Sequence, residues 1–424
     1  MTMTRTDAAI DVERIRSAFP ALAGPMAFME NAGGSQVPRV VADAIRDFML
    51  REYVQLGAPY ELSSQATQTV ADAHEFINRF MNGEDRGTVI LGPSCTSLSM
   101  MLADCYARAL PGDAEIIVME SGHEANVGPW DRLADRGFTV KIWTCDPQTG
   151  QSHLDDLKAL LSEKTAIVAC VHVSNLLGDI EDVPAITALA HEVGARVVVD
   201  GVAYAPHRAI DVAAWDVDWY IYSTYKVYGP HMAALFGKHD AIDELTGPHH
   251  FFIPKQEIPY KFEANGVSYE GCAGLLALQD YLRFVIGDTG AGPIDRSGIE
   301  GAFDILTNLE MQTQGRLVAY LQSRNDIRII GPTHAEESRV STISFVHTSK
   351  SSREIAESVC RHGIGIRHGH MYAYRLCERL GLAAGDGVVR VSLVHYNSPG
   401  EVDRLIAALD DTLDSDRSDV QESR

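Results

Sequence analysis

The feature of this sequence that most constrains its fold is a regular alternation of apolar runs with amphipathic segments. The apolar runs cover 88–92, 116–119, 140–143, 166–171, 195–199 and 219–222. The intervening and upstream segments predict helices over 8–23, 38–52, 64–81, 127–136, 153–162 and 183–193. Strands that are apolar throughout and alternate with helices are typical of a mainly parallel sheet covered on both faces. We therefore predict an α/β fold.

The overall composition narrows the class of protein. The chain has 424 residues, which favours two domains, and a net charge of −22, which argues against a nucleic-acid partner. No apolar run is long enough to span a membrane, and the N-terminus lacks a secretory pattern. The seven cysteines are scattered without CxxC spacing, which indicates reduced thiols and no metal site. We expect a cytoplasmic protein.

Polar residues follow several of the predicted strands where each strand ends. These residues are His123, Asn175, Asp200, Ser223 and Lys226. In a parallel sheet the carboxyl ends of the strands meet at one edge, and ligands bind there. Each residue alone is more often structural, but five at one edge predict a functional site.

Lys226 follows the aromatic-rich run 219–222 and precedes a turn at Gly229-Pro230. An amine near the end of a buried strand is partly desolvated, which lowers its pKa and makes it a nucleophile for an aldehyde. We therefore propose that Lys226 forms a Schiff base with pyridoxal phosphate; the alternative is a surface lysine after a strand.

The other polar residues supply what this cofactor needs. The sequence Ser94-Cys95-Thr96-Ser97 lies between a strand and a predicted helix, where free N–H groups can bind a phosphate, although such residues are also common helix caps. Ser223 adds a hydroxyl. Asp200 could pair with the pyridine nitrogen, His123 could lie flat on the ring, and Asn175 could bind the phenolic oxygen.

The last third of the chain predicts a long helix over 296–323 and then a smaller α+β unit. Strands are predicted over 340–346, 364–367 and 388–393, with a helix over 352–362. Arg390 alternates with apolar neighbours in the last strand and suits carboxylate binding. Ser398 and Glu401 form a predicted capping box for the final helix, and the tail from about 414 is expected to be disordered.

Across almost its whole length the chain resembles the class V aminotransferase family of fold-type I pyridoxal-phosphate enzymes, in particular its cysteine desulfurase-like branch. The stretches that carry the resemblance are 31–32, 92–98, 123–126 with 129–130, 174–178, 200–201, 223–230, 271–275, 366–370 and 390–393 with 396–397. The resemblance implies a seven-stranded, mainly parallel sheet in a large domain (25–290), a small domain (1–24 and 291–424), and a homodimer.

The resemblance also implies roles for individual residues. The residues assigned to the cofactor are Cys95, Thr96, His123, Asn175, Asp200, Ser223, Tyr225 and Lys226. Lys226 and His123 are the predicted catalytic residues. The residues assigned to an amino-acid substrate are Asn31, Arg367, Tyr372 and Arg390, of which Arg390 would bind the α-carboxylate.

Four positions depart from the family pattern. Tyr372 stands where desulfurases carry their persulfide cysteine, and Cys377 lies further on in a predicted helix. Ala203 replaces a glutamine, Tyr225 replaces the histidine before the lysine, and Gly266 replaces a threonine that reaches the neighbouring subunit. We therefore expect lyase or desulfurase-like chemistry at Cα without a persulfide cysteine; transamination, epimerisation and a protein that binds the cofactor without turnover are the alternatives.

Overall fold

A computed structural model describes residues 11–264, 266–383 and 385–421. Its centre is a seven-stranded sheet in the order β2-β8-β7-β6-β5-β3-β4. The strands are β2 (Gly87–Gly92), β3 (Glu115–Met119), β4 (Thr139–Trp143), β5 (Thr165–Val171), β6 (Arg196–Asp200), β7 (Trp219–Ser223) and β8 (Ala233–Lys238). β8 runs antiparallel to β2 and β7, and the pairs from β7 to β4 are parallel. The predicted α/β fold with a mainly parallel sheet is confirmed.

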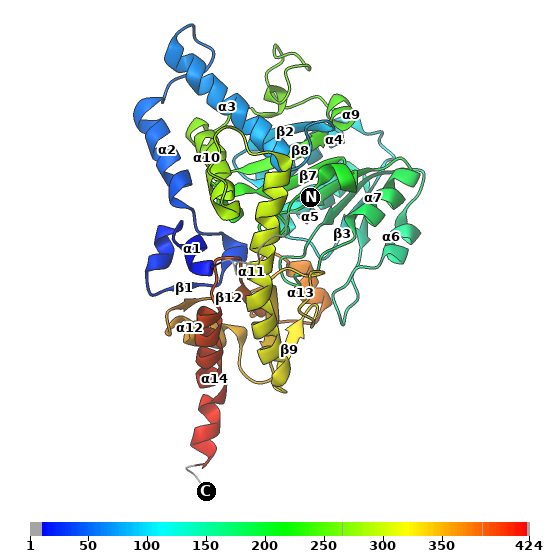
Figure 1. Cartoon of the computed structure of the whole chain (residues 1–424). Helices are drawn as coiled ribbons and strands as arrows, with labels where there is room; N and C mark the ends of the chain where they lie inside the picture. Colours follow the sequence, from blue (N-terminus) through cyan, green and yellow to red (C-terminus); the bar gives the residue numbers. More distant parts are fainter. Residues whose placement is uncertain (1–10, 265, 384, 422–424) are drawn as a thin grey trace, which may run out of the picture.

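Helices cover both faces of this sheet (Figure 1). One face packs against α3 (Glu61–Phe80), α6 (Leu154–Leu160), α7 (Val183–Glu192), α10 (Tyr269–Ile286) and α11 (Arg296–Ser323). The other face packs against α4 (Cys95–Ala109), α5 (Glu124–Asp131) and α9 (His239–Asp243). Alternate strand residues, such as Val198 and Val199, are buried on opposite faces. Both faces of the sheet are therefore buried from solvent, which explains why the strands are apolar throughout.

A second, antiparallel sheet follows in the order β12-β13-β10-β9. Its strands are β9 (Ile327–Ile330), β10 (Thr342–His347), β12 (Arg367–Gly369) and β13 (Val388–Ser392), and it packs with α12 (Ser352–Cys360) and α14 (Pro399–Gln421). β1 (Ala27–Phe28) pairs with β11 (Ile364–Gly365). The remaining helices are α1 (Val12–Arg16), α2 (Arg39–Arg51), α8 (Val212–Trp215) and α13 (Tyr374–Arg379).

The long helix α11 contributes to the cores of both sheets. Its first half buries Phe303 and Leu306 against the central sheet, and its second half buries Leu317 and Leu321 against the antiparallel sheet. Figure 1 shows α11 running from one to the other. The predicted domain boundaries at 24/25 and 290/291 stay predictions. Among the described residues, no helix is long and apolar enough to cross a bilayer.

The structure corrects three expectations. The helix predicted over 8–23 is instead α1 followed by a 3-10 turn, Pro20–Ala23, because Pro20 interrupts it; residues 8–10 lie outside the described residues. The strand predicted over 364–367 is divided into β11 and β12. The tail expected to be disordered from about 414 continues α14 to Gln421, since neither glycine nor proline occurs between 401 and 421.

The capping box at the start of α14 is confirmed. The Ser398 amide donates to Oε2 of Glu401 at 2.9 Å, and the Glu401 amide donates to Oγ of Ser398 at 3.2 Å. This reciprocal pair satisfies two backbone N–H groups that have no acceptor within the helix.

Candidate active site

A cavity of about 610 Å³, including its open mouth, lies at the carboxyl ends of β5, β6 and β7. It is bounded on one side by the first turns of α4 and α5. The polar side chains that line it are Ser94, Cys95, Thr96, His123, Asn175, Asp200, Ser223, Tyr225, Lys226 and His231. The structure thus brings together all eight residues that were predicted to bind the cofactor.

Lys226 ends a 3-10 turn, Thr224–Lys226, directly after β7. The turn is fixed by Thr224, whose amide donates to the Met232 carbonyl at 3.0 Å and whose hydroxyl donates to the Pro230 carbonyl at 2.6 Å. Among the described residues, none hydrogen-bonds to the Lys226 amine. Burial and the positive charge of Arg390 lower the pKa of Lys226 to about 8, against the opposing effect of Asp200. The amine is available as a nucleophile near neutral pH.

Asp200 lies at the end of β6 and is 7% exposed. Its Oδ1 accepts a hydrogen bond from the Val202 amide at 2.9 Å, and no basic side chain forms an ion pair with it among the described residues. Burial raises the pKa of Asp200, while the Val202 amide and Lys226 act in the opposite direction. A buried carboxylate without a cationic partner suits a protonated pyridine nitrogen.

His123 caps α5, and its Nδ1 accepts a hydrogen bond from the Ala125 amide at 3.0 Å. The ring proton is therefore assigned to Nε2. Burial, Lys226 and Arg390 lower the pKa of His123 to about 4, so the ring is neutral at physiological pH. A neutral, planar ring held by a helix cap is suited to contact an aromatic cofactor.

The first turn of α4 provides an anion site beside these residues. Oγ of Ser94 accepts from the Ser97 amide at 3.1 Å, whereas the amides of Cys95 and Thr96 have no acceptor within the helix. Cys95 is buried with its sulfur 3.1 Å from Oγ of Ser223. Thr96 is exposed and lines the cavity. Free amides at the positive end of a fifteen-residue helix suit a phosphate.

A second cavity adjoins the first and shares His123, Asn175, Tyr225 and Lys226 with it. Its other lining residues are Ala32, Gly33, Arg367, Met371, Tyr372 and Arg390. The cavities meet at Lys226, so a ligand in the second one would be presented directly to the amine.

Arg390 lies on β13 and is 3% exposed. Its Nη1 donates to the Asn175 carbonyl at 3.2 Å, whereas its Nε is buried without a partner. Burial lowers the pKa of Arg390 to about 10, with Glu30 acting to raise it and Arg367 to lower it. Arg367 itself pairs with Glu30 at 2.7 Å. A buried guanidinium with an unused donor is poised to bind a carboxylate.

Tyr372 lies at the mouth of the second cavity, 62% exposed. Its ring centroid is 5.2 Å from that of His123. Met371 and Tyr372 have φ of 48° and 62°, a left-handed conformation that is strained for residues other than glycine. The loop is held by Asn175, whose Nδ2 donates to the Met371 carbonyl at 2.8 Å and whose Oδ1 is buried without a partner.

Asn31, which was predicted to contact the substrate, has its side chain hydrogen-bonded within the protein. Its Nδ2 donates to the carbonyl of Ser392 at 2.8 Å and to the side chain of Asn397 at 3.1 Å, and its Oδ1 accepts from the hydroxyl of Tyr396. The side chain is thus fully engaged, and the neighbouring Ala32 and Gly33 line the second cavity instead. Asn31 fastens the N-terminal segment to the end of β13.

His231 lines the first cavity as well, and no sequence pattern predicted it. Its ring stacks on that of Tyr225, with centroids 4.4 Å apart and planes 6° from parallel. The only signal in the sequence was the turn at Gly229-Pro230, which sends the chain back past Lys226 into β8. Among the described residues, no group of His, Cys, Asp and Glu side chains is arranged to hold a metal ion.

The residues of the first cavity fit pyridoxal phosphate. The unpartnered Lys226 amine, the buried Asp200 and the free amides of α4 match the aldehyde, the ring nitrogen and the phosphate in chemical character.

Comparisons with known proteins agree with this fit. The Aminotransferase class-V family matches residues 27–405. The chain is 38% identical to aminotransferase-like protein FGM3 of Gibberella zeae, over 96% of this chain and all of that protein. It is 30% identical to a cysteine desulfurase of Dickeya dadantii, over 94% of this chain and 96% of that protein.

A solved structure gives the same result. The cysteine desulfurase CsdA from Escherichia coli superposes with a TM-score of 0.80 at 25% identity, over 95% of this chain and 98% of that chain. The chain therefore belongs to the class-V aminotransferase family, in its cysteine desulfurase-like branch, and is a pyridoxal-phosphate-dependent enzyme.

Proposed function

We propose that the enzyme acts at Cα of an amino acid whose α-carboxylate is bound by Arg390. The observation that carries this proposal is the buried Arg390 guanidinium, with Nε unpartnered, in a cavity that also contains the Lys226 amine. When bound, pyridoxal phosphate supplies an electron sink for the charge that develops at Cα.

The chain's own residues would divide the remaining work. Lys226 would hold the cofactor aldehyde and, once released by the substrate, accept the Cα proton, for which an amine of pKa about 8 is suited. Asp200 would keep the pyridine nitrogen protonated, and His123 would cover the ring as a neutral plane. Asn175 would bind the phenolic oxygen of the cofactor in one of two ways. Its free Oδ1 would accept a hydrogen bond from a protonated phenol, or the second hydrogen of Nδ2 would be donated to a deprotonated one.

The placement of the cysteines argues against a persulfide intermediate. Tyr372 lies where the resemblance places the sulfur-accepting cysteine, and Cys377 is buried in α13, where burial raises the pKa of its thiol to about 11. Cys360, the exposed cysteine, lies on α12 and lines neither cavity. Tyr372 and Arg367 would instead contact the substrate side chain.

Arg390→Ala tests the proposal. The common amino acids are first screened for a change in the cofactor's absorbance, and the strongest responder is titrated into the wild type and the variant. We expect the apparent dissociation constant to rise by about a hundredfold, the equivalent of losing a buried bidentate ion pair, with the cofactor still bound. Arg390→Lys keeps the positive charge but loses the planar, two-pronged donor arrangement of the guanidinium. Its apparent dissociation constant should therefore lie between those of the wild type and Arg390→Ala.

Arg328→Ala is the matched control, because Arg328 is an exposed arginine on β9 of the same sheet. Equal affinity in the wild type and Arg390→Ala would refute the assignment. Product analysis then identifies the reaction: sulfide, or a keto acid together with ammonia, for elimination; a keto acid together with an aminated cofactor for transamination; or inverted Cα for epimerisation.

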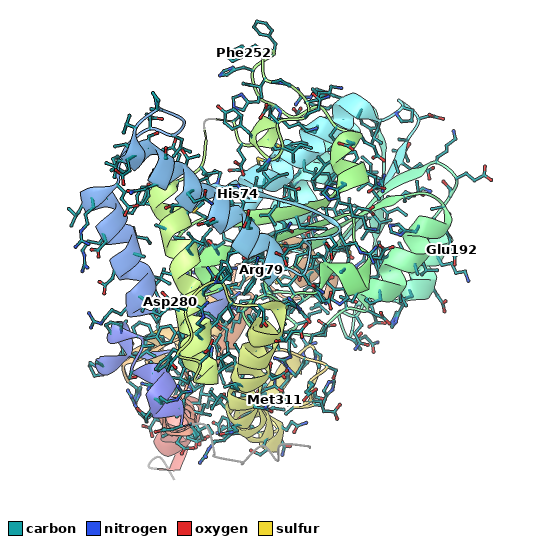
Figure 2. The ribbon with its side chains drawn as sticks, turned by 45° about the horizontal axis from the view of Figure 1, so that its top comes forward. His74, Arg79, Glu192, Phe252, Asp280 and Met311 are labelled. Atoms are coloured by element: carbon teal, nitrogen blue, oxygen red, sulfur yellow. The ribbon has the colours of Figure 1, made fainter. Side chains whose placement is uncertain are left out.

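A homodimer is the assembly that we propose. Large apolar side chains are exposed on two parts of the surface: Phe251 and Phe252 before α10, and Met49, Leu50 and Tyr53 around the end of α2. Figure 2 shows Phe252 projecting from the molecule. Exposed apolar groups of this kind are typical of a subunit interface.

A further inference from the structure

We propose that His231 binds the phosphate group of the cofactor from the outer side of the cavity, supported by Tyr225. This inference rests on the proposed placement of the cofactor between Lys226 and the first turn of α4. The two rings lie parallel, 4.4 Å apart, and both line that cavity.

The position of His231 follows from the hairpin formed by β7 and β8. Ser223 pairs with Ala233 in the antiparallel register, and the Thr224 amide donates to the Met232 carbonyl at 3.0 Å. His231 is therefore held at the same end of the hairpin as Ser223 and Lys226. Ser223 is in turn 3.1 Å from the sulfur of Cys95, the first residue of α4, so the hairpin end adjoins the anion site.

Charge balance indicates what His231 would bind. A phosphate ester carries nearly two negative charges at neutral pH. The basic side chains among the described lining residues are Lys226, His123 and His231. Lys226 would hold the aldehyde, and His123 is neutral with its Nδ1 already used by Ala125. His231 is the basic group that is left, and no described residue hydrogen-bonds to its ring.

Tyr225 would hold the imidazole in place and complete the wall of the site. Burial raises the pKa of Tyr225, against the effect of the Ser223 hydroxyl, so its phenol is a neutral donor. Its ring also lies against Gly34, where an added Cβ would be 3.4 Å from Cδ2 of Tyr225. The tyrosine is thus packed between the N-terminal segment and His231, and stacking fixes the plane in which the imidazole N–H groups point.

His231→Phe tests the inference, since phenylalanine keeps the stacking on Tyr225 and removes the N–H donors. Cofactor-free protein is titrated with pyridoxal phosphate and separately with pyridoxal, and binding is followed by absorbance. We expect the dissociation constant for pyridoxal phosphate to rise about ten- to a hundredfold, as for loss of a charge-assisted hydrogen bond. The constant for pyridoxal, which has no phosphate, should change less than about twofold.

Two further variants complete the test. His231→Gln keeps one side-chain donor and should recover part of the lost affinity. His239→Phe, at an exposed histidine that begins α9 and lines neither cavity, should leave both constants unchanged. Equal weakening of both ligands in His231→Phe, or no weakening, would overturn the inference. Failure of the wild type to bind either compound at Lys226 would contradict the proposed cofactor placement itself.

Discussion

Lys226 is the residue whose environment most directly controls the chemistry. Its pKa of about 8 results from burial and from Arg390, opposed by Asp200. In cofactor-free protein, the rate at which pyridoxal is captured should therefore rise with pH and level off above about 8, rather than near the ordinary lysine value of 10.5. Borohydride reduction after timed mixing, followed by mass spectrometry, measures this rate at each pH.

Two variants give the sign of each contribution. Arg390→Gln removes a positive charge that disfavours the ammonium form, so the midpoint should move to higher pH. Asp200→Asn removes a negative charge that favours it, so the midpoint should move to lower pH. Shifts in the same direction in both variants would contradict this account of the site.

At the scale of elements, the apolar runs made the site predictable. The positions of Asp200, Lys226 and His123 just after apolar runs predicted that these residues lie together, and all three line the first cavity. The prediction works because the carboxyl ends of parallel strands meet at one edge of the sheet, whatever the conformation of the loops. The contacts of Asn31 could not be predicted, since its partners Ser392 and Asn397 are more than 360 positions away in the chain. His231 was missed because its place depends on the return of β8 beside β7.

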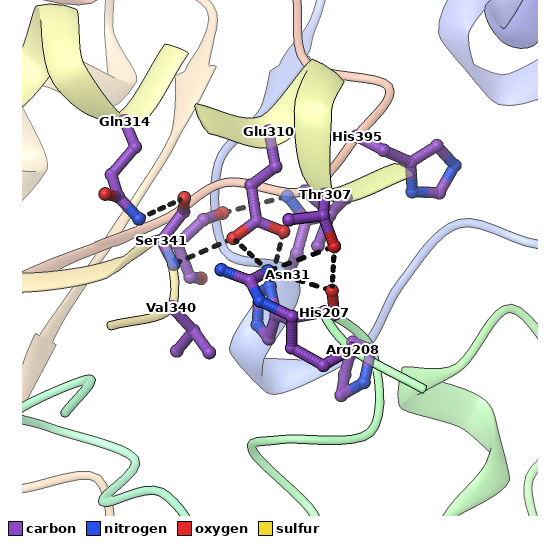
Figure 3. Close-up of polar contacts among 12 residues, drawn as sticks. Asn31, His207, Arg208, Thr307, Glu310, Gln314, Val340, Ser341 and His395 are labelled. Carbon is purple, nitrogen blue, oxygen red and sulfur yellow. Dashed lines mark hydrogen bonds and ion pairs between the residues drawn. The ribbon is translucent and has the colours of Figure 1, made fainter. Parts of the chain in front are cut away.

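Helix α11 carries a buried carboxylate, Glu310, whose contacts no local sequence pattern predicts. Glu310 is 1% exposed, and its carboxylate binds Nδ1 of His207 at 2.7 Å and the Ser341 amide at 3.0 Å (Figure 3). Burial alone would raise the pKa of Glu310, but His207 and Arg208 outweigh it and hold the pKa below its usual value. Helix α11 thereby connects two segments. The first contains His207 and follows β6, which ends at Asp200, and the second contains Ser341 and precedes β10.

For the whole molecule, the homodimer makes a separate prediction. Sedimentation equilibrium should give twice the chain mass for the wild type. Phe251 and Phe252 are 100% and 66% exposed, so replacing both by serine should leave the fold intact. The dissociation constant of the dimer should rise, because apolar contact area is lost. A monomer mass for the wild type at micromolar concentration would contradict the proposed assembly.

The most direct test of the central claim identifies the residue that carries the cofactor. The folded chain is mixed with pyridoxal phosphate, reduced with borohydride, digested and mapped by mass spectrometry. We predict a single pyridoxyl adduct on Lys226, and none in Lys226→Ala. An adduct on another lysine, or the same amount of adduct in the variant, would show that the cavity at the end of β7 is not the site of covalent chemistry.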